Sequence, residues 1–92
     1  METTKDIQIG QFVRSKAGRD KDRIFIVMKI VDEKYVLIAD GDLRRIEKPK
    51  KKKIRHLALL SSVSTSLKDK LSGDGKINNA YVRREIEKLG LN

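Results

Sequence analysis

Cysteine is absent from this chain of 92 residues, and histidine occurs once, at position 56. Without cysteine the chain forms neither a disulfide nor a thiolate metal site, and one histidine does not complete a usual transition-metal site. The lack of cysteine also fits a reducing compartment. We therefore expect no metal ion and no other cofactor.

Long apolar runs are missing as well. The longest one is too short to cross a bilayer. The N-terminal segment, Met1 to Asp6, begins with charges and has no apolar region of the kind that a signal peptide contains. The expectation is a soluble cytoplasmic protein that does not contact a membrane.

Positive charge, by contrast, is abundant. The chain has 22 lysine and arginine residues against 13 aspartate and glutamate residues, a formal net charge of +9. The 13 residues from Arg44 to His56 carry eight cations and one acid, which is +7 of that total, and they include the run Lys50–Lys53. Such clustering costs self-repulsion unless a polyanion neutralises it, and nucleic acid is the commonest polyanion in a cell. The charge pattern therefore favours nucleic-acid binding.

Two other interpretations of the lysine run stay open. Blocks of like charge are often solvated faces or disordered arms. The segment Pro49–Lys53 also resembles a nuclear-localisation patch. Such patches are usually exposed and mobile, whereas strand-like segments flank this run on both sides.

Catalytic groups are scarce. A catalytic triad would need a nucleophile and an orienting acid that converge on His56. Ser61 and Ser62 are close to it in sequence, but no pattern brings them close in space. We expect no enzyme and no small-molecule substrate, with His56 at a strand end or in contact with RNA.

Aromatic residues are also few: Phe12, Phe25, Tyr35 and Tyr81. Three of them fall inside expected strands, where packing in the core is the default interpretation. Proteins that bind single strands usually offer aromatic stacking platforms. The scarcity of such residues therefore favours phosphate and shape contacts on a folded RNA.

The part of the chain before residue 61 has the pattern of short β-strands. Isoleucine and valine are concentrated in Ile24–Val31, whose alternation places Ile30 on the face of Ile26, and Asp40-Gly41-Asp42 predicts a hairpin turn. Pro49 argues against a central strand in the basic run, which we expect to be a connection. The fold class predicted is mainly β, a small antiparallel barrel of the SH3-like type. Its five strands are expected at Phe12–Lys16, Ile24–Val31, Tyr35–Ala39, Leu43–Glu47 and Ile54–Leu59.

Apolar residues recur at helical intervals in the last third of the chain. The spacing predicts a short helix over residues 64–72 and a second helix over residues 79–89, with Asn78 as its N-cap. The second helix has one narrow apolar stripe, so it must dock on another surface to be stable. We therefore divide the chain into a barrel, residues 7–60, and a helical C-terminal extension, residues 61–92. The stripe consists of Val82, Ile86 and Leu89.

The segment from Ile9 to Asp20, continued from Arg23 to Ile38, resembles a KOW motif. KOW motifs are strand-loop-strand units with a key glycine, which would be Gly18 in this chain. They occur in ribosomal proteins and in transcription elongation factors. The resemblance implies an SH3-like barrel that binds ribosomal RNA without catalysis.

The order of the elements is also similar to one family of KOW proteins, the archaeal and eukaryotic large-subunit ribosomal proteins called "fourteen-e". Small bacterial KOW proteins of this ribosomal-like type are similar as well. The resemblance covers about residues 7–59. The shared elements are a G-x-x-V opening, an A-G-R loop, a hydrophobic strand, a D-E-x-x-V-L turn and a basic run ending in H-L, here Gly10–Val13, Ala17–Arg19, Ile24–Ile30, Asp32–Leu37 and Lys50–Leu57.

The predicted binding site consists of two basic loops that the barrel holds in fixed positions. Their ammonium and guanidinium groups would match phosphates of a structured RNA, with ribosomal RNA as the expected partner and ribosomal proteins as further candidates. Gly18 would let the loop backbone approach the RNA closely. The alternative is a protein-interaction module that uses the C-terminal helix. The predicted RNA-binding residues are Arg14, Lys16, Gly18, Arg19, Lys21, Arg23, Arg44, Arg45, Lys48, Lys50, Lys51, Lys52, Lys53, Arg55 and His56.

Overall fold

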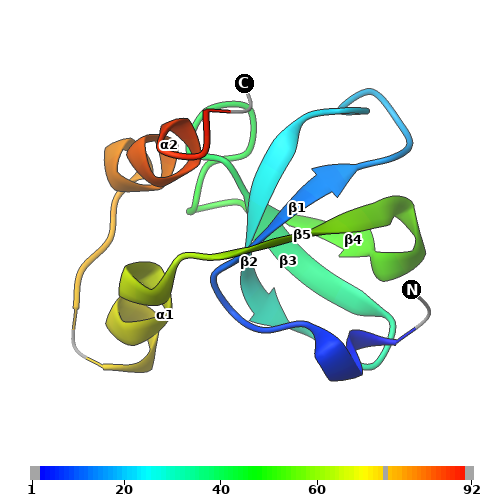
Figure 1. Cartoon of the computed structure of the whole chain (residues 1–92), viewed down its shortest axis with the longest axis horizontal. Coiled ribbons are helices and arrows are strands. Elements are labelled where there is room, and N and C mark those ends of the chain that lie inside the picture. Colours follow the sequence, from blue (N-terminus) through cyan, green and yellow to red (C-terminus); the bar gives the residue numbers. More distant parts are fainter. Residues whose placement is uncertain (1–2, 74, 91–92) are drawn as a thin grey trace.

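The computed structural model describes residues 3–73 and 75–90. Within them, one antiparallel sheet with the strand order β4-β3-β2-β1-β5 is followed by two helices (Figure 1). The mainly β fold class and the two C-terminal helices are therefore confirmed. The elements are the 3₁₀-helix η1 (Thr4–Asp6), β1 (Gln11–Ser15), β2 (Ile24–Ile30), β3 (Tyr35–Ala39), β4 (Lys50–Lys53), the 3₁₀-helix η2 (Ile54–His56), β5 (Leu57–Val63), α1 (Thr65–Ser72) and α2 (Asn79–Glu87).

The sheet is strongly curved, but its strand pairing does not close a barrel, so that expectation is corrected. In the described part of the chain β4 and β5 are the two edges, and no ladder joins them. The chain passes from one edge to the other through the three residues of η2 alone. Because a 3₁₀-helix rises only about 2 Å per residue, the two edges must come close together at this end of the sheet. The result is an open, curved sheet.

The inner face of this curved sheet holds the first core. Val13, Phe25, Val27 and Val36 are fully buried there, and Ile54 of η2 packs on them. Branched and aromatic side chains at alternate strand positions produce this face, as the sequence pattern predicted. The hydrophobic surface buried here is the main stabilising term for the sheet.

The outer face of β1 and β2 is covered by both helices and forms the second core (Figure 1). Phe12 and Ile26 of the sheet pack with Leu67 of α1 and with Val82 and Ile86 of α2, all of them buried. The apolar stripe of α2 therefore docks on its own sheet. β5 runs to Val63, three residues past residue 60, the expected end of the barrel.

A register shift between Val27 and Lys29 changes the faces of β2. Lys29 is paired with Leu37, and Ile30 with Val36, so Ile30 packs against the inner core. The simple alternation that placed Ile30 with Ile26 is wrong at this point, because a β-bulge adds one residue to one strand.

The expected strand Leu43–Glu47 is wrong: this segment consists of turns. Asp40 explains the difference, because its Oδ1 accepts hydrogen bonds from the backbone N–H groups of Asp42 (3.0 Å) and Arg44 (2.8 Å). The backbone N–H of Asp40 in turn donates to the carbonyl of Arg44 at 3.0 Å. These bonds close the chain into a compact turn instead of a hairpin strand.

The basic run Lys50–Lys53, expected to be a connection, is strand β4. It pairs with β3 along its full length and forms an edge of the sheet, directly after Pro49. Proline is compatible with that position, because it is tolerated just outside an edge strand. Charged side chains on an edge also oppose pairing with another chain. The predicted closing strand differs too, because Ile54–His56 forms η2 before β5 begins.

The two predicted helices are confirmed, including the N-cap of the second. Ser64 Oγ accepts a hydrogen bond from the N–H of Leu67, and Asn78 Oδ1 accepts one from the N–H of Tyr81. Gly90 adopts a positive φ of 68° after α2, as expected for a helix stop. Asp74 and residues 91–92 of the expected extension lie outside the described residues. None of the helices described is long and apolar enough to traverse a bilayer.

Candidate nucleic-acid interface

The two segments predicted to bind RNA lie side by side at one end of the sheet. The loop between β1 and β2 is attached to η2, because the backbone N–H of Lys16 donates to the carbonyl of His56 at 2.8 Å. It is also attached to β4, since Lys52 Nζ donates to the carbonyl of Ala17 at 2.9 Å. Cations that are distant in the sequence are thereby brought to a common end of the molecule.

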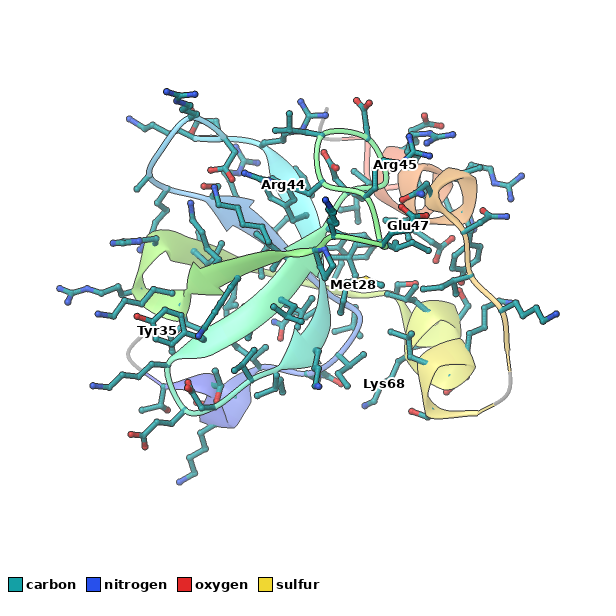
Figure 2. All side chains as sticks on the ribbon, turned by 180° about the vertical axis from the view of Figure 1, so that it is seen from behind. Met28, Tyr35, Arg44, Arg45, Glu47 and Lys68 are labelled. Carbon is teal, nitrogen blue, oxygen red and sulfur yellow. The ribbon has the colours of Figure 1, made fainter. Side chains whose placement is uncertain are left out.

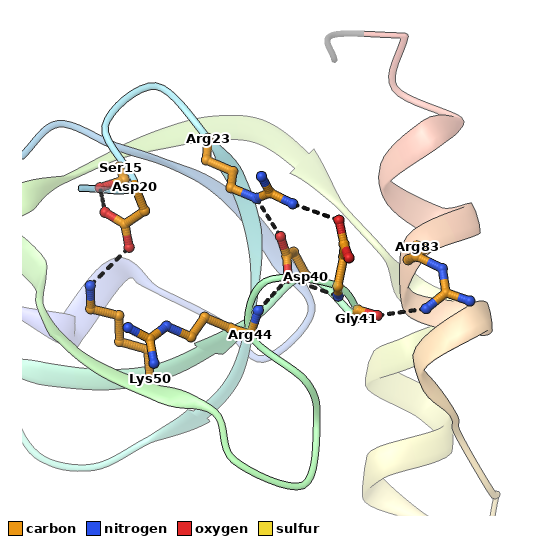
Figure 3. Close-up of polar contacts among 9 residues, drawn as sticks. Ser15, Asp20, Arg23, Asp40, Gly41, Arg44, Lys50 and Arg83 are labelled. Carbon is orange, nitrogen blue, oxygen red and sulfur yellow. Dashed lines mark hydrogen bonds and ion pairs between the residues drawn. The ribbon is translucent and has the colours of Figure 1, made fainter. Parts of the chain in front are cut away.

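Asp20 is the centre of this attachment. Its carboxylate accepts hydrogen bonds from Ser15 Oγ at 2.7 Å and Lys50 Nζ at 3.0 Å (Figure 3). It accepts a third one from Lys52 Nζ at 3.1 Å. Asp20 is 4% exposed and Lys52 is 6% exposed. Burial by itself would raise the pKa of Asp20, but the hydrogen bonds from Ser15, Lys50 and Lys52 and the charge of Lys52 hold that pKa well below its usual range. Asp20 therefore stays ionised and links the loop to β4.

The four lysines of β4 divide between the two faces of the sheet. Lys50 and Lys52 are paired with Ile38 and Val36, which belong to the inner core, so their side chains lie on the inner side and end at Asp20. Lys51 and Lys53 lie on the outer side. This alternation follows from the two-residue period of a strand.

Arg23 of the first predicted loop has a structural role. Its guanidinium contacts Asp40 at 2.5 Å and Asp42 at 2.9 Å (Figure 3). The hydrogen bond to Asp40 is the main cause that raises the pKa of Arg23. Nearby, Arg83 of α2 donates to the carbonyl of Gly41 at 2.6 Å. Together these contacts hold the turn after β3 between the sheet and α2.

Arg44 and Arg45 follow this turn and face different surroundings. Arg44 is half-buried, and its Nε is buried without a hydrogen-bond partner in the described part of the chain. Arg45 is exposed and lies 3.5 Å from Glu47. Because an exposed ion pair of this kind contributes little, Arg45 remains available to an anion.

The other predicted cations make no ion pair with the described residues. Gly18 is exposed among them and has a φ of 87°, a conformation that glycine adopts without strain. His56 is exposed as well. Asp22 is an exposed acid in the same loop, so the surface is not uniformly positive. The unpaired cations are Arg14, Lys16, Arg19, Lys21, Lys48, Lys51, Lys53 and Arg55; Arg14 and Lys53 are half-buried and the other six are exposed.

Two groups that the sequence analysis did not select belong to this region. Tyr35, expected in the core, is half-buried on the outer face, with Lys51 Nζ 4.8 Å from its ring centroid. Beside it, Lys34 lines a hollow of ≈ 260 Å³ together with Lys53, Ile54 and Arg55. The alternation of β3 carried the signal for Tyr35, because Tyr35 is out of phase with the buried Val36.

The chain is similar to a protein whose name points to the ribosome. The chain is 33% identical over 73 residues to a protein of Bacillus subtilis (strain 168) named "Putative ribosome-binding protein YbzG", which covers 79% of this chain and 99% of the relative. The chain belongs to the family of that protein. No family model matches the chain. The relative has almost its entire length in common with this chain, so the relationship covers most of the sheet and is not limited to a short motif.

Proposed function

We propose that this protein binds the ribosome in the cytoplasm and contacts ribosomal RNA through the basic end of its sheet. We call this end the loop surface and define it by Lys16, Gly18, Arg19, Lys21 and Arg55. The relative named for ribosome binding supports the ribosome as the partner. The attachment of both basic segments through Asp20 supports RNA phosphates as the contact, and this is the observation that carries the proposal.

The geometry supports phosphate binding in a specific way. Four exposed cations of the loop surface make no ion pair with the described residues, while Asp20 neutralises only the cations that hold the loop in place. The loop needs little ordering when RNA binds, since backbone and ion-pair contacts already fix it, and less conformational entropy is lost. Arginine offers bidentate contacts to phosphate, and lysine acts as a point charge.

The finer family assignment is part of the same proposal. We infer a KOW unit in β1, the following loop and β2, with Gly18 as its key glycine, and an SH3-like arrangement of the curved sheet. The positive φ of Gly18, 87°, supports this assignment, because a side chain at that position would be strained. The role is proposed to be binding without catalysis.

The alternative, a protein-interaction module that uses the C-terminal helix, depended on an apolar stripe that is free to meet a partner. Val82 and Ile86 of α2 are 0% and 4% exposed, because they pack on the protein's own sheet. The apolar stripe that would have met a partner is thus already covered.

Binding to ribosomal RNA stripped of ribosomal proteins tests the proposal. The tagged protein is mixed with purified ribosomal subunits and, separately, with the deproteinised RNA of the same subunits, over a series of salt concentrations. We expect binding to both, with an affinity that falls steeply as salt increases, because phosphate contacts release counterions. Binding to intact subunits but not to the naked RNA would contradict an RNA contact and favour a ribosomal protein.

A further inference from the structure

The outer face of β3 and β4 is an exposed sheet surface that shares one residue, Arg55, with the loop surface. Both helices cover β1 and β2, and Tyr35 lies on the side of the molecule away from them (Figure 2). On this face Leu37 is paired with Lys29 on one side and Lys51 on the other, while Tyr35 is paired with Lys53. Three lysines therefore surround one aromatic ring and one leucine.

A positively charged hollow is lined by the residue before Tyr35, Lys34, and by the strand partner of Tyr35, Lys53. Its lining, ≈ 260 Å³ in volume, consists of Lys34, Lys53, Arg55 and the buried Ile54, with no acidic residue. The three cations make no ion pair with the described residues. Its walls are joined by a hydrogen bond from the backbone N–H of Ile54 to the carbonyl of Lys34 at 2.9 Å. A hollow with three cations and no acid is complementary to a phosphate group.

The ring of Tyr35 is suited to stacking. Lys51 Nζ lies 4.8 Å from the ring centroid, so the π-face is accessible to a group from solvent. Stacking of a nucleobase on such a face is stronger than the contact of an exposed ammonium with it. A base that displaces Lys51 leaves this ammonium beside the phosphates of the same strand.

We propose that this face, which we call the tyrosine face, binds unpaired RNA: the base of one nucleotide stacks on Tyr35 and its phosphate enters the hollow of Lys34, Lys53 and Arg55. The inference rests on the proposed function and deepens it, because it assigns single-stranded RNA to a face of the sheet that lies outside the loop between β1 and β2. Base stacking needs an unpaired nucleotide, whereas phosphate contacts at the loop surface accept a duplex.

The test compares a short single-stranded oligouridylate with a fully paired RNA duplex as probes. Tyr35→Leu keeps an apolar side chain in the strand but removes the ring, and Tyr35→Phe keeps the ring. We expect Tyr35→Leu to weaken oligouridylate binding by about fivefold to a hundredfold, the range of one lost base stack. Tyr35→Phe should bind like the wild type, and duplex binding should be unchanged in both variants.

Salt dependence separates the stacking contact from the phosphate contacts. Lys34→Gln and Lys53→Gln should each reduce the slope of log affinity against log salt for oligouridylate by about 0.7, whereas Tyr35→Leu should leave the slope unchanged. Lys68→Gln, an exposed lysine on α1, is the matched control and should have no effect.

Tyrosine fluorescence gives a second measurement that does not depend on the folding of Tyr35→Leu. The chain contains two tyrosines and no tryptophan, so Tyr81→Phe leaves Tyr35 as the single reporter. Oligouridylate should quench its emission, and the duplex should not.

The outcomes distinguish this inference from the proposed function. If Tyr35→Leu binds oligouridylate as tightly as the wild type, or if Tyr35→Phe loses as much affinity as Tyr35→Leu, the tyrosine face is contradicted, while duplex and ribosomal RNA binding still support the loop surface. Absence of quenching with bound oligouridylate would contradict stacking as well. If the wild-type protein binds no RNA at all, both proposals fail.

Discussion

The two faces of β4 use the same amino acid for different purposes. Lys50 and Lys52 lie on the inner side and end at the carboxylate of Asp20, whereas Lys51 and Lys53 lie on the outer side without an ion pair to any described residue. The inner pair is attached to the loop and stabilises the fold. The outer pair leaves its charge available to an anion. A run of identical cations is therefore not one functional unit, because strand alternation separates its members.

Among the substitutions that test the division of β4 into two faces, we expect the largest loss of stability at Asp20. Replacing Asp20 with alanine would leave the buried ammonium of Lys52 without its ion-pair partner, and breaking a buried ion pair in this way costs about 3 to 5 kcal/mol. We expect Asp20→Ala to lower the free energy of unfolding by about that amount, measured by urea denaturation. A loss below about 1 kcal/mol, the size of an exposed ion pair, would show that the carboxylate does not hold the loop.

Lys52 and Lys51 provide the next test as a matched pair. Lys52→Ala removes a charge-assisted hydrogen bond, worth about 1.5 to 3 kcal/mol, but leaves Asp20 bonded to Lys50 and Ser15. Lys51→Ala removes only an exposed contact with Tyr35, worth about 0.5 to 1 kcal/mol. Denaturation of both variants should show the larger loss for Lys52→Ala. Equal losses would contradict the division of β4 into two faces.

Low pH should reduce the contribution of Asp20 to the free energy of unfolding. Because the pKa of Asp20 is lower in the folded protein than its ordinary value of about 3.9, its contribution to stability is present above about pH 4 and is lost as the pH falls further. The difference in unfolding free energy between wild type and Asp20→Asn should therefore shrink below pH 4, by at most about 1.4 kcal/mol per pH unit. A difference that stays constant from pH 6 to pH 3 would be inconsistent with an ion-paired Asp20.

The outer lysines should have the smallest effect on stability and a measurable effect on binding. Lys51→Gln combined with Lys53→Gln should change the free energy of unfolding by no more than about 1 kcal/mol, because the variant loses only the exposed contact of Lys51 with Tyr35. The same variant should reduce the salt slope of single-stranded RNA binding by about 1.4, since about 0.7 is expected for each lost phosphate contact. An unchanged slope would show that these lysines do not contact phosphate.

The sequence predicts those parts of the fold that local patterns determine. Alternation of branched residues identifies β2 and β3, and Asn78 identifies the start of α2, because capping depends on residues a few positions apart. The strand Lys50–Lys53 depends instead on its pairing with β3 and on the contact of Lys50 with Asp20, thirty residues earlier. No local rule assigns a strand to four lysines, so the local pattern predicted a connection there.

The candidate site shows the same limit. The clustering of the two basic segments follows from the strand order and was anticipated, but the structural role of Arg23 was not. Arg23 and Arg19 belong to the same loop and look equivalent in the sequence; only the fold places Asp40 beside Arg23. Tyr35 was assigned to the core because it lies in a strand. The alternation of β3 separates Tyr35 from the buried Val36, but only the docking of both helices on β1 and β2 leaves its side of the sheet uncovered.

The salt dependence of ribosomal RNA binding tests directly whether the loop surface contacts the RNA phosphates. Two triple variants, each removing three positive charges, are compared with the wild type: Lys16, Arg19 and Lys21 changed to glutamine on the loop surface, and Lys68, Lys76 and Arg84 changed to glutamine in the helical region. All six positions are exposed, so both variants should fold. We predict that the first variant lowers the slope of log affinity against log salt by about 2 to 2.7, while the second leaves it close to the wild-type value. Equal changes in the two variants would mean that only net charge matters, and would contradict a binding surface at the loop end of the sheet.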